Sequence, residues 1–315
     1  MSISRRTELR QRIFVAAPAK LNLCLQIVGS REDGYHLLDS ILVPIRLCDY
    51  VAIAIRRRGA ADVELVCEPA DAAPPGADNL AARAAELYCA RTGWRPRLRI
   101  ELRKVIPVGA GLGGGSSDAA AVLRGLNAIS DKPVSRSELA AWALELGADV
   151  PFFVYGRAAR MRGIGERLDP ITPPLPAGHP VVVAFPGIGL NTREVYARYD
   201  DSLTSREAAS TIRQLTFGQG PLGSELSNDL EDAALQVLPA LGDLKRQLQL
   251  LGARGVRMTG SGSAVFGVWN RAGDARAAAA ALREAGTWAR ATEVIDRIPA
   301  IDMDEDIRNG RSPSW

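Results

Sequence analysis

The stretch that most constrains this chain is PVGAGLGGGSSDAAAV, residues 107–122, which places five glycines within seven residues directly before an alanine-rich helix pattern. The first turn of a helix has free N–H groups and a positive dipole end, and glycines in front of it let the backbone approach phosphate oxygens. A turn that only permits tight packing needs one or two glycines. The stretch therefore predicts a phosphate or nucleotide site, with Ser116 and Ser117 as hydroxyl donors and one of them as the helix cap.

The residues around these glycines argue against three known phosphate loops. A Walker A loop closes with Gly-Lys-Ser or Gly-Lys-Thr, whereas these glycines end in Ser-Ser-Asp. A dinucleotide-binding oxidoreductase needs a continuous apolar strand before the loop and an acid about 20 residues after it. Here the preceding RLRIELRKVIPV alternates with charges, and Asp131 lies in a polar turn. A protein kinase needs VAIK, HRD and DFG motifs, and none of the three occurs.

Composition excludes several other classes of protein. The 315 residues are 47% hydrophobic and 24% charged, which is typical of a soluble globular protein. The net charge of +3 is small and the basic residues are spread out, so neither a nucleic acid nor a membrane is expected as a partner. The four cysteines form no CxxC pair, which argues against a zinc site or a disulfide framework. Without an apolar run near the roughly 20 residues of a membrane span and without a signal peptide, we expect a cytoplasmic protein.

Hydrophobic periodicity predicts both strands and helices in the first half of the chain. Alternating residues predict a largely antiparallel sheet from strands over 13–30, 37–58, 61–69 and 97–108. Helices are predicted over 78–93, 116–130 and 135–147. The first of these helices has Asp78 or Asn79 as its cap and Gly93 as its stop. The residues 148–163 are typical of a turn that leads into a further strand.

The second half follows a proline-rich segment, PITPPLPAGHP, at residues 170–180. This composition indicates a linker, so we predict an N-terminal domain over 1–172, a C-terminal domain over 179–300 and a polar tail over 301–315. The C-terminal domain is predicted to contain a buried strand at 181–187, helices around 205–215, 227–252 and 273–286, and a strand-turn-strand pattern at 254–269. Strands and helices mixed in both halves predict the α+β class.

Three stretches together resemble the GHMP kinases, which transfer a phosphoryl group from ATP to small alcohols. PVGAGLGGGSSDAA resembles the second motif of that superfamily, PAKLNLCLQI near the N-terminus resembles the first, and MTGSGSAVFGV resembles the third. The resemblance covers nearly the whole chain. It implies a two-domain fold with an N-terminal ribosomal-protein-S5-like domain, a C-terminal ferredoxin-like α/β sandwich and an active site in the cleft between them.

PAKLNL followed by REDGYHLLDSI, together with GADVPFFV and SNDLE, is similar to one branch of the superfamily, whose alcohol substrate carries a cytidine diphosphate group. The resemblance implies ATP as phosphoryl donor with Mg²⁺, and it implies a small-molecule partner and a monomer or weak homodimer. It assigns ATP to Pro107, Val108, Gly109, Ala110, Gly111, Leu112, Gly113, Gly114, Gly115, Ser116 and Ser117, with Asn79 and Leu80 beside the adenine. The metal ligands are not legible: Ser117 and Asp118 are candidates, although Asp118 equally fits an ordinary first-turn acid.

Two residues are candidates for the chemistry of phosphoryl transfer, which needs positioned charges and a group that takes the hydroxyl proton. Asp149 is predicted to lie past a helix end and before an apolar strand, where an acid is ordinarily a turn residue. Lys20 lies in an alternating strand, where a lysine ordinarily faces solvent. Of the 39 basic residues only four are lysines. The resemblance matches Asp149 to the catalytic acid and Lys20 to the catalytic lysine, and predicts that they lie side by side.

The resemblance also assigns a substrate pocket. It implies that Tyr35 stacks on cytosine, that His36 binds the edge of the base and that Tyr196 covers the opposite face. The remaining predicted substrate residues are Asn22, Thr192, Gly260, Ser261 and Gly262. From the residues alone, DGYH favours a hairpin whose aromatic side chain covers the core, and GSGSAV equally fits a tight turn between two strands.

Two further functions stay open beside this one. Another GHMP kinase, of the homoserine or mevalonate type, would share the phosphate loop but would not need DGYH. A non-catalytic nucleotide or sugar sensor could share the fold, although such a protein would not need both Lys20 and Asp149.

Overall fold

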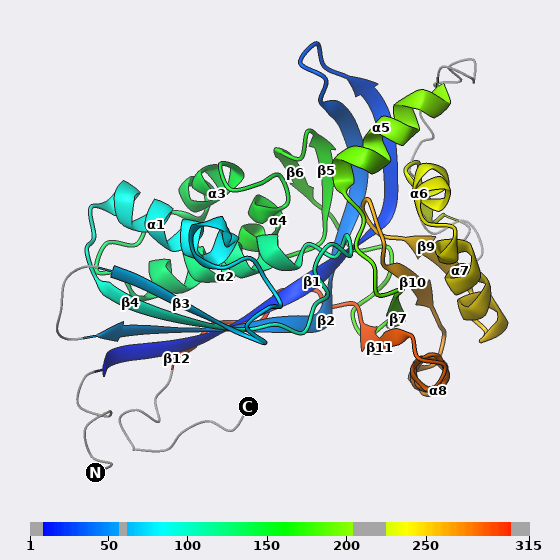
Figure 1. The fold of residues 1–315 in the computed structure, drawn as a ribbon. Helices are drawn as coiled ribbons and strands as arrows, with labels where there is room; N and C mark the ends of the chain where they lie inside the picture. The colour runs from blue at the N-terminus through cyan, green and yellow to red at the C-terminus, as the bar shows by residue number, and fades with distance from the viewer. Residues whose placement is uncertain (1–8, 57–61, 204–224, 304–315) are drawn as a thin grey trace.

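The computed structural model describes residues 9–56, 62–203 and 225–303, and the helix expected around 205–215 lies outside them. Two sheets with their helices lie beside each other (Figure 1). In the described residues the first sheet has eight strands, five of them in the order β12-β1-β2-β4-β3. Of the other three, β5 pairs with β2, β6 pairs with β5, and β8 pairs with β1. Their bounds are β1 Leu9–Ser30, β2 His36–Arg56, β3 Asp62–Glu68, β4 Arg97–Arg103, β5 Ala159–Gly163, β6 Arg167–Pro170, β8 Ser227–Asn228 and β12 Asp302–Met303.

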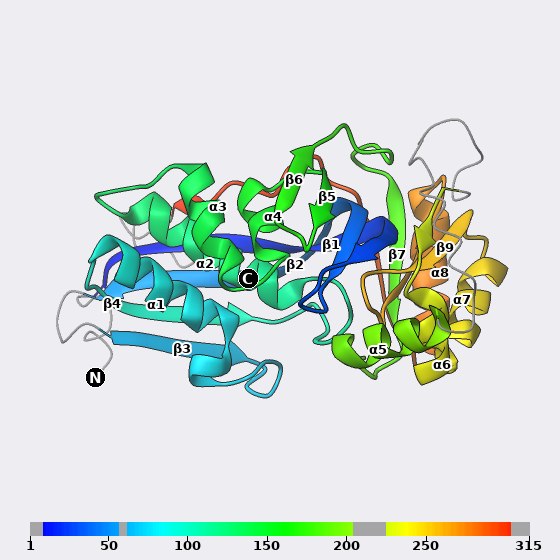
Figure 2. The same cartoon turned by 90° about the horizontal axis from the view of Figure 1, so that it is seen from above.

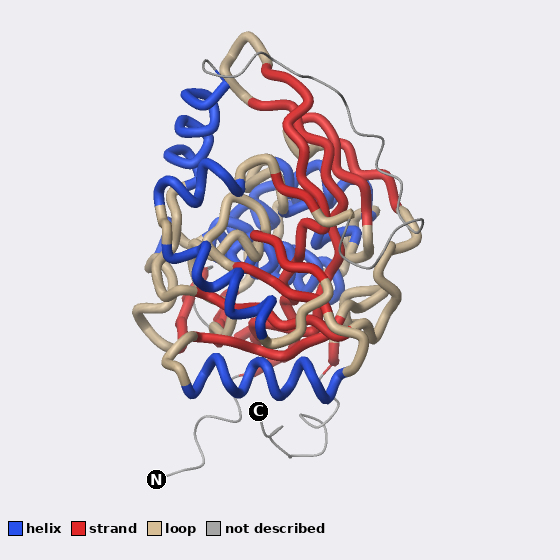
Figure 3. The backbone as a smooth tube through the Cα atoms, turned by 90° about the vertical axis from the view of Figure 1, so that its right-hand side faces the viewer, coloured by secondary structure: helices blue, strands red, loops and turns tan. Residues whose placement is uncertain are grey.

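The longest antiparallel pair in this sheet is that of β1 with β2. Its pairing runs from Leu9 opposite Arg56 to Ser30 opposite His36. The tip of this hairpin projects at the top of the molecule, where Figure 3 draws strands in red. The expectation of a largely antiparallel sheet is confirmed, with parallel pairs only where β3 meets β4 and β8 meets β1 in the described chain.

Four helices cover one face of the first sheet (Figures 1 and 2). They are α1 Leu80–Thr92, α2 Gly114–Ile129, α3 Arg136–Leu144 and α4 Val150–Tyr155, and a short 3₁₀ turn at Gly76–Asp78 precedes α1. The side chain of Asn79 caps α1 by accepting a hydrogen bond of 2.9 Å from Ala81 N, and Gly93 ends the helix with a left-handed φ of 69°. Both predicted ends of this helix are confirmed.

Two local predictions are wrong. Neither Ser116 nor Ser117 caps α2: the N-cap is Gly113, with a φ of 71°, and it makes no side-chain bond. The segment after Asp149 enters a helix, α4, before it reaches the strand β5. A buried apolar run of six residues carries no periodicity that separates helix from strand. Pro151 in the first turn and Gly156 as a left-handed C-cap are the signals that favour a helix here.

The second sheet is built from β7 Pro180–Phe185, β9 Gly255–Met258, β10 Val265–Val268 and β11 Trp288–Glu293, in the order β11-β7-β10-β9. Its helices are α5 Thr192–Leu203, α6 Glu231–Val237, α7 Ala240–Leu250 and α8 Ala272–Glu284. This succession agrees with the β-α-β-β-α-β order of the expected ferredoxin-like sandwich. The six residues of β7 are buried, as the apolar run at 181–187 predicts.

Three apolar clusters hold the molecule together. One lies between the first sheet and α1 to α4, and another lies between the second sheet and its helices. The third joins the two sheets, because it contains Leu21 and Val43 from β1 and β2 together with Val183 and Phe266 from β7 and β10. The first and second halves of the chain therefore share an apolar contact beside the cleft described below.

The end of the described chain returns to the first sheet. Val294 pairs with Ile45, and Asp302–Met303 form β12 beside Phe14 and Ile13. The first residues of the expected polar tail are thus part of a strand. In the described residues, no helix combines the length and the apolar character needed to cross a membrane.

Candidate active site

The predicted site residues come together in a cleft of about 730 Å³ that residues from both halves of the chain line. Most of the predicted catalytic, phosphate and substrate residues line this cleft: Lys20, Asn22, Tyr35, His36, Gly109, Gly111, Gly113, Ser116, Asp149, Thr192, Tyr196, Gly260, Ser261 and Gly262. Segments separated by more than 200 residues in the sequence are therefore neighbours here.

The first wall of the cleft is the glycine loop, residues 109–113, which leads into α2. Gly109, Gly111 and Gly113 have φ values of 69°, 73° and 71°, which residues other than glycine rarely adopt. A Cβ on Gly111 would collide with the Thr259 carbonyl oxygen and would lie 3.0 Å from Gly262 N. Glycine is needed at this position both for the backbone turn and for close contact with a second loop.

That second loop, residues 259–263, is called the Gly260 loop below. It connects β9 to β10, and Ala264, the residue directly after it, donates a hydrogen bond of 3.0 Å from its N to Ala110 O of the glycine loop. A Cβ on Gly260 would lie 3.1 Å from Lys20 Nζ. Ser261 Oγ is 2.8 Å from Thr192 Oγ1, at the start of α5. The Gly260 loop therefore joins Lys20, the glycine loop and α5.

Lys20 lies where the two loops meet, and the expectation that it forms a pair with Asp149 agrees with the geometry. Lys20 Nζ is 3.7 Å from Asp149 Oδ2, and the side chains are 4% and 31% exposed. Burial lowers the pKa of Lys20, and the negative charge of Asp149 opposes that shift. A buried ammonium beside a partly solvated carboxylate can stabilise negative charge while the carboxylate accepts a proton.

Asp149 is positioned by the start of α4 rather than by the expected strand. It occupies the N-cap position, but its carboxylate makes no capping hydrogen bond, and Pro151 follows in the first turn. The carboxylate is therefore not engaged by the helix that carries it, and it lines the cleft.

Asn22 connects Lys20 to the Gly260 loop. Its Oδ1 accepts a hydrogen bond of 2.5 Å from Lys20 Nζ, and its Nδ2 donates to Ser40 Oγ at 2.8 Å. Thr259 Oγ1 accepts from Asn22 N at 3.0 Å and donates to Asn22 Oδ1 at 3.3 Å. Asn22 was expected to line the substrate pocket, and in the structure its polar side-chain atoms also hold Lys20 in place. Ser40 and Thr259 were not predicted as site residues.

A second part of the cleft is lined by the β1–β2 hairpin and α5. His36 Nε2 is 2.8 Å from Asp200 Oδ1, and the rings of His36 and Tyr196 are 4.8 Å apart with an interplanar angle of 31°. Tyr35 is 62% exposed. Burial, with a smaller contribution from the charge of Asp149, raises the pKa of Tyr196 to about 12. The predicted substrate residues meet here, and Asp200 joins them without any signal that marks it in the sequence.

Several predicted phosphate-site residues lie behind the cleft surface. Ala110 and Leu112 are buried in the cluster between the sheets. Asn79 is buried, and its side chain is occupied by Ala81 N and Pro74 O, so it serves the helix end. Leu80 lies beside the glycine-rich helix start, since a Cβ on Gly115 would lie 3.6 Å from Leu80 Cδ1. Neither Asn79 nor Leu80 lines the cleft.

Beneath the glycine loop lies a charged group that we call the Asp49 cluster, formed by Asp49, Lys104 and Asp118. Lys104 Nζ donates to Asp118 Oδ2 at 2.7 Å and also bonds Asp49 Oδ2, and all three side chains are at most 4% exposed. Asp49 Oδ1 accepts from Val105 N at 2.5 Å and from Ile106 N at 2.8 Å. Burial, followed by the negative charge of Asp49, raises the pKa of Asp118 to about 8, although Lys104 opposes the shift.

The two candidate metal ligands differ in this setting. Asp118 belongs to the Asp49 cluster, where its Oδ2 already accepts from the Lys104 ammonium at 2.7 Å, while its buried Oδ1 has no hydrogen-bond partner in the described structure. Ser117 is buried, and its Oγ has no hydrogen-bond partner in the described structure, so this hydroxyl fits a ligand at the start of α2. The described residues contain no group of three His, Cys, Asp or Glu side chains that could hold a metal. A Mg²⁺ ion here would take most of its ligands from phosphates and water.

Comparison with known proteins identifies two family domains in the chain. The family model for the GHMP kinases N terminal domain matches residues 79–157, and the model for the GHMP kinases C terminal domain matches residues 213–287. A 4-diphosphocytidyl-2-C-methyl-D-erythritol kinase of Syntrophotalea carbinolica is 40% identical over 86% of this chain and 95% of its own. A kinase of the same name from Thermus thermophilus is 43% identical over 87% of this chain and 93% of its own.

Solved structures agree in fold. A crystal structure of 4-(cytidine 5'-diphospho)-2C-methyl-D-erythritol kinase superposes with a TM-score of 0.72 at 39% identity, and the match covers 89% of this chain and 98% of the other. Homoserine kinase from Cytophaga hutchinsonii superposes with a TM-score of 0.66 at 17% identity over 93% of this chain and 98% of its own. At that identity the second match supports the fold alone.

Proposed function

The chain belongs to the 4-diphosphocytidyl-2-C-methyl-D-erythritol kinases of the GHMP kinase family, and from this premise we propose its reaction and the residues that perform it. The chain transfers the γ-phosphoryl group of ATP to the 2-hydroxyl of 4-diphosphocytidyl-2-C-methyl-D-erythritol, in the non-mevalonate route to isoprenoid precursors. The observation that carries the proposal is the distance of 3.7 Å between Lys20 Nζ and Asp149 Oδ2 where the glycine loop meets the Gly260 loop.

The glycine loop and the first turn of α2 bind the ATP phosphates. The free N–H groups of this turn and the positive end of the helix dipole favour a phosphate there. Mg²⁺ neutralises charge on the phosphates when it is bound, with Ser117 Oγ as the protein ligand that best fits. Gly111 and Gly113 allow the left-handed turns that shape the loop in front of this helix.

Asp149 is the general base of the proposed reaction. Its carboxylate accepts the proton of the attacking hydroxyl while that oxygen forms a bond to the γ-phosphorus and the bond to the β-phosphate oxygen breaks. Lys20 remains protonated beside Asp149 and stabilises the negative charge that develops on the transferred group. Asn22 keeps the ammonium in position through its bond of 2.5 Å.

The cytidine group binds between the β1–β2 hairpin and α5. Tyr35 and Tyr196 offer aromatic faces for the base, and His36 offers a ring nitrogen for its edge. Tyr196 and His36 are already in ring contact at 4.8 Å, so the base displaces or extends this contact when it binds. Thr192, together with Ser261 of the Gly260 loop, lies nearer the reacting alcohol.

A test measures ADP release from Mg-ATP with 4-diphosphocytidyl-methylerythritol, homoserine and mevalonate offered separately. We expect turnover of the cytidyl substrate alone, and we expect Asp149→Asn to lower kcat by about 10²- to 10⁴-fold, because general bases contribute that much. Turnover of homoserine or mevalonate instead would contradict the cytidine pocket. ATP binding without turnover of any alcohol would favour the sensor over the kinase.

A further inference from the structure

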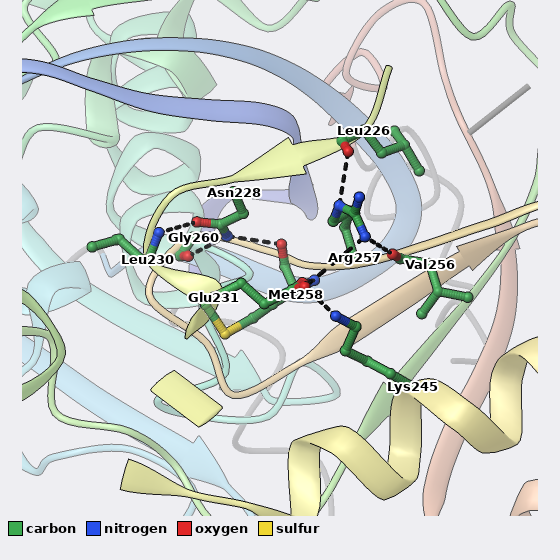
Figure 4. A network of polar contacts seen from close by, with 9 residues as sticks. All are labelled: Leu226, Asn228, Leu230, Glu231, Lys245, Val256, Arg257, Met258 and Gly260. Atoms are coloured by element: carbon green, nitrogen blue, oxygen red, sulfur yellow. Dashed lines mark hydrogen bonds and ion pairs between the residues drawn. The ribbon is translucent and has the colours of Figure 1, made fainter. Parts of the chain in front are cut away.

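The segment Ser227 to Glu231, which the SNDLE resemblance marks but the proposed reaction does not use, connects the first sheet to the Gly260 loop (Figure 4). Asp229 N donates to Leu25 O at 3.0 Å, and Asp229 Oδ2 accepts from Ile27 N at 2.8 Å, so the segment is attached to β1. Its other contacts reach β9 and the residue after it. The segment is therefore placed to fix β9 and the residue after it relative to β1.

Asn228 uses both of its amide donors on the backbone that leads into the Gly260 loop. Its Nδ2 donates to Met258 O at 2.9 Å and to Gly260 O at 2.8 Å, while its Oδ1 accepts from Leu230 N at 3.0 Å (Figure 4). The two carbonyls flank Thr259 on either side. A single side chain thus fixes the carbonyl groups of the residues before and after Thr259.

Glu231 supports the same strand from α6. Its Oε2 accepts from Met258 N at 2.7 Å, its Oε1 bonds Lys245 Nζ, and Arg257 Nη1 lies 3.9 Å from Oε1 (Figure 4). The Glu231 side chain is 10% exposed, so the Lys245 ammonium is needed to compensate its buried charge. Glu231 and Asn228 together bind both polar backbone groups of Met258.

From Asn228 a series of hydrogen bonds, joined through the backbone at Thr259, reaches the proposed catalytic pair. Thr259, held between the two carbonyls that Asn228 binds, contacts Asn22 through its Oγ1. Asn22 Oδ1 accepts from Lys20 Nζ, which lies 3.7 Å from Asp149. Asn228 lines no part of the cleft itself, so any effect on the chemistry passes through this series.

We propose that Asn228, supported by Glu231, is a positioning residue that sets the Gly260 loop, and through Thr259 and Asn22 the Lys20 ammonium, for phosphoryl transfer. This inference rests on the proposed kinase reaction. A displacement of a reacting group by about 1 Å can cost on the order of 10²-fold in rate. A displacement of the Gly260 loop should therefore reduce kcat more than it changes the affinity for ATP, because the ATP phosphates contact the glycine loop in the proposed reaction.

The test compares the wild-type chain with Asn228→Asp, which keeps the size and the Oδ1 acceptor but replaces the two donors with an oxygen that faces two carbonyls. We expect kcat to fall by about tenfold or more while KM for ATP changes less than about threefold. Asn228→Ser, which keeps one hydroxyl donor, should show a smaller loss in kcat. It also serves as the test if the aspartate variant does not fold.

The matched control is Asn127→Asp. Asn127 binds backbone in the same way, with Nδ2 donating to Val134 O at 3.0 Å and Oδ1 accepting from Val134 N at 2.8 Å, but it does not line the cleft. We expect this variant to lower Tm while kcat stays within about twofold. Equal kcat losses at positions 228 and 127 would overturn the positioning role and leave a structural one.

Hydrogen exchange gives a readout that needs no substrate. We expect faster exchange in peptides covering 258–266 of Asn228→Asp, with peptides covering 109–117 unchanged. Wild-type kcat retained by both Asn228 variants would overturn this inference and leave the proposed function intact. A wild-type chain that turns over no alcohol would overturn the proposed function, and the positioning role with it, so the two failures are distinguishable.

Discussion

The glycine loop and the Gly260 loop both contact Lys20, but different parts of the chain hold them. The glycine loop owes its course to its own glycines, to the helix that follows it and to the Asp49 cluster, in which Lys104 and Asp118 are close to the loop in sequence. The Gly260 loop depends on Asn228, about 30 residues earlier, and on Thr192, about 70 residues earlier. Apart from Asp49, the residues that specify the first wall of the cleft are its neighbours in sequence, whereas the second wall depends on distant side chains.

The largest expected effect comes from the residue that both loops share. Lys20→Met should lower kcat by about 10²- to 10³-fold, since it removes a cation that stabilises developing charge. Tm should not fall, because burial disfavours the lysine charge, lowering its pKa, and methionine fills a similar volume. The measurements are steady-state kinetics and thermal unfolding. Activity within tenfold of wild type would show that the meeting point of the loops is not the centre of the chemistry.

The next effect tests whether contact between the loops matters. Gly111→Ala should destabilise the fold by about 2–4 kcal/mol. The loop would hold alanine at a left-handed φ, and the new Cβ would collide with Thr259 O. Urea unfolding measures this loss. The control is Gly242→Ala in α7, where the nearest atom to a new Cβ is Leu235 Cδ2 at 3.6 Å. That variant should gain about 0.5 kcal/mol. Equal stabilities for the two variants would contradict a tight contact.

The smallest effect concerns the Asp49 cluster, which lies beneath the glycine loop. The folded pKa of Asp118, about 8, is higher than its ordinary value of 3.8, so between these pH values the folded state binds a proton that the unfolded state has lost. This group therefore stabilises the fold at the low end of this pH range, and its contribution is lost as pH rises toward the folded pKa.

Asp118→Asn should remove this dependence. We expect the Tm of the variant to rise relative to wild type as pH increases from 5 to 8, measured by thermal unfolding at each pH. Parallel Tm curves would mean that Asp118 is ionised throughout and that Lys104 alone compensates both carboxylates. Hydrogen exchange of the Gly260 loop should not change, which separates the two walls of the cleft.

The same contrast explains what the sequence could predict. The glycine loop, the Asn79 cap and the Gly93 stop are local patterns, and each was predicted from neighbouring residues. Lys20 and Asp149 needed the family resemblance, because neither residue type nor spacing shows that they meet. The α4 helix was not predicted, because six buried apolar residues show no period and only Pro151 and Gly156 mark its two ends.

The site residues that the sequence did not predict are those whose partners lie far away in the sequence. Asn228 lies in a segment that carries a recognisable motif, yet its contacts with Met258 and Gly260 exist only after the two sheets have packed. Thr259 and Asp200 likewise gain their roles from residues more than 160 positions away. The SNDLE resemblance was the signal that could have identified Asn228, but no local rule gives it a partner.

The long strand β1 has a consequence for how the chain is made. One edge of β1 pairs with β2, which leaves the ribosome soon afterwards, while the other edge waits for Ser227 at Cys24 and for Met303 at Ile13. At roughly 5–20 residues per second of synthesis, that interval lasts on the order of ten to forty seconds. An open strand edge is a template for pairing with other chains. During translation the nascent protein therefore carries a β1 edge that can pair with other chains. Fragments that end before residue 225 lack β8 and β12 and leave this edge unpaired by them.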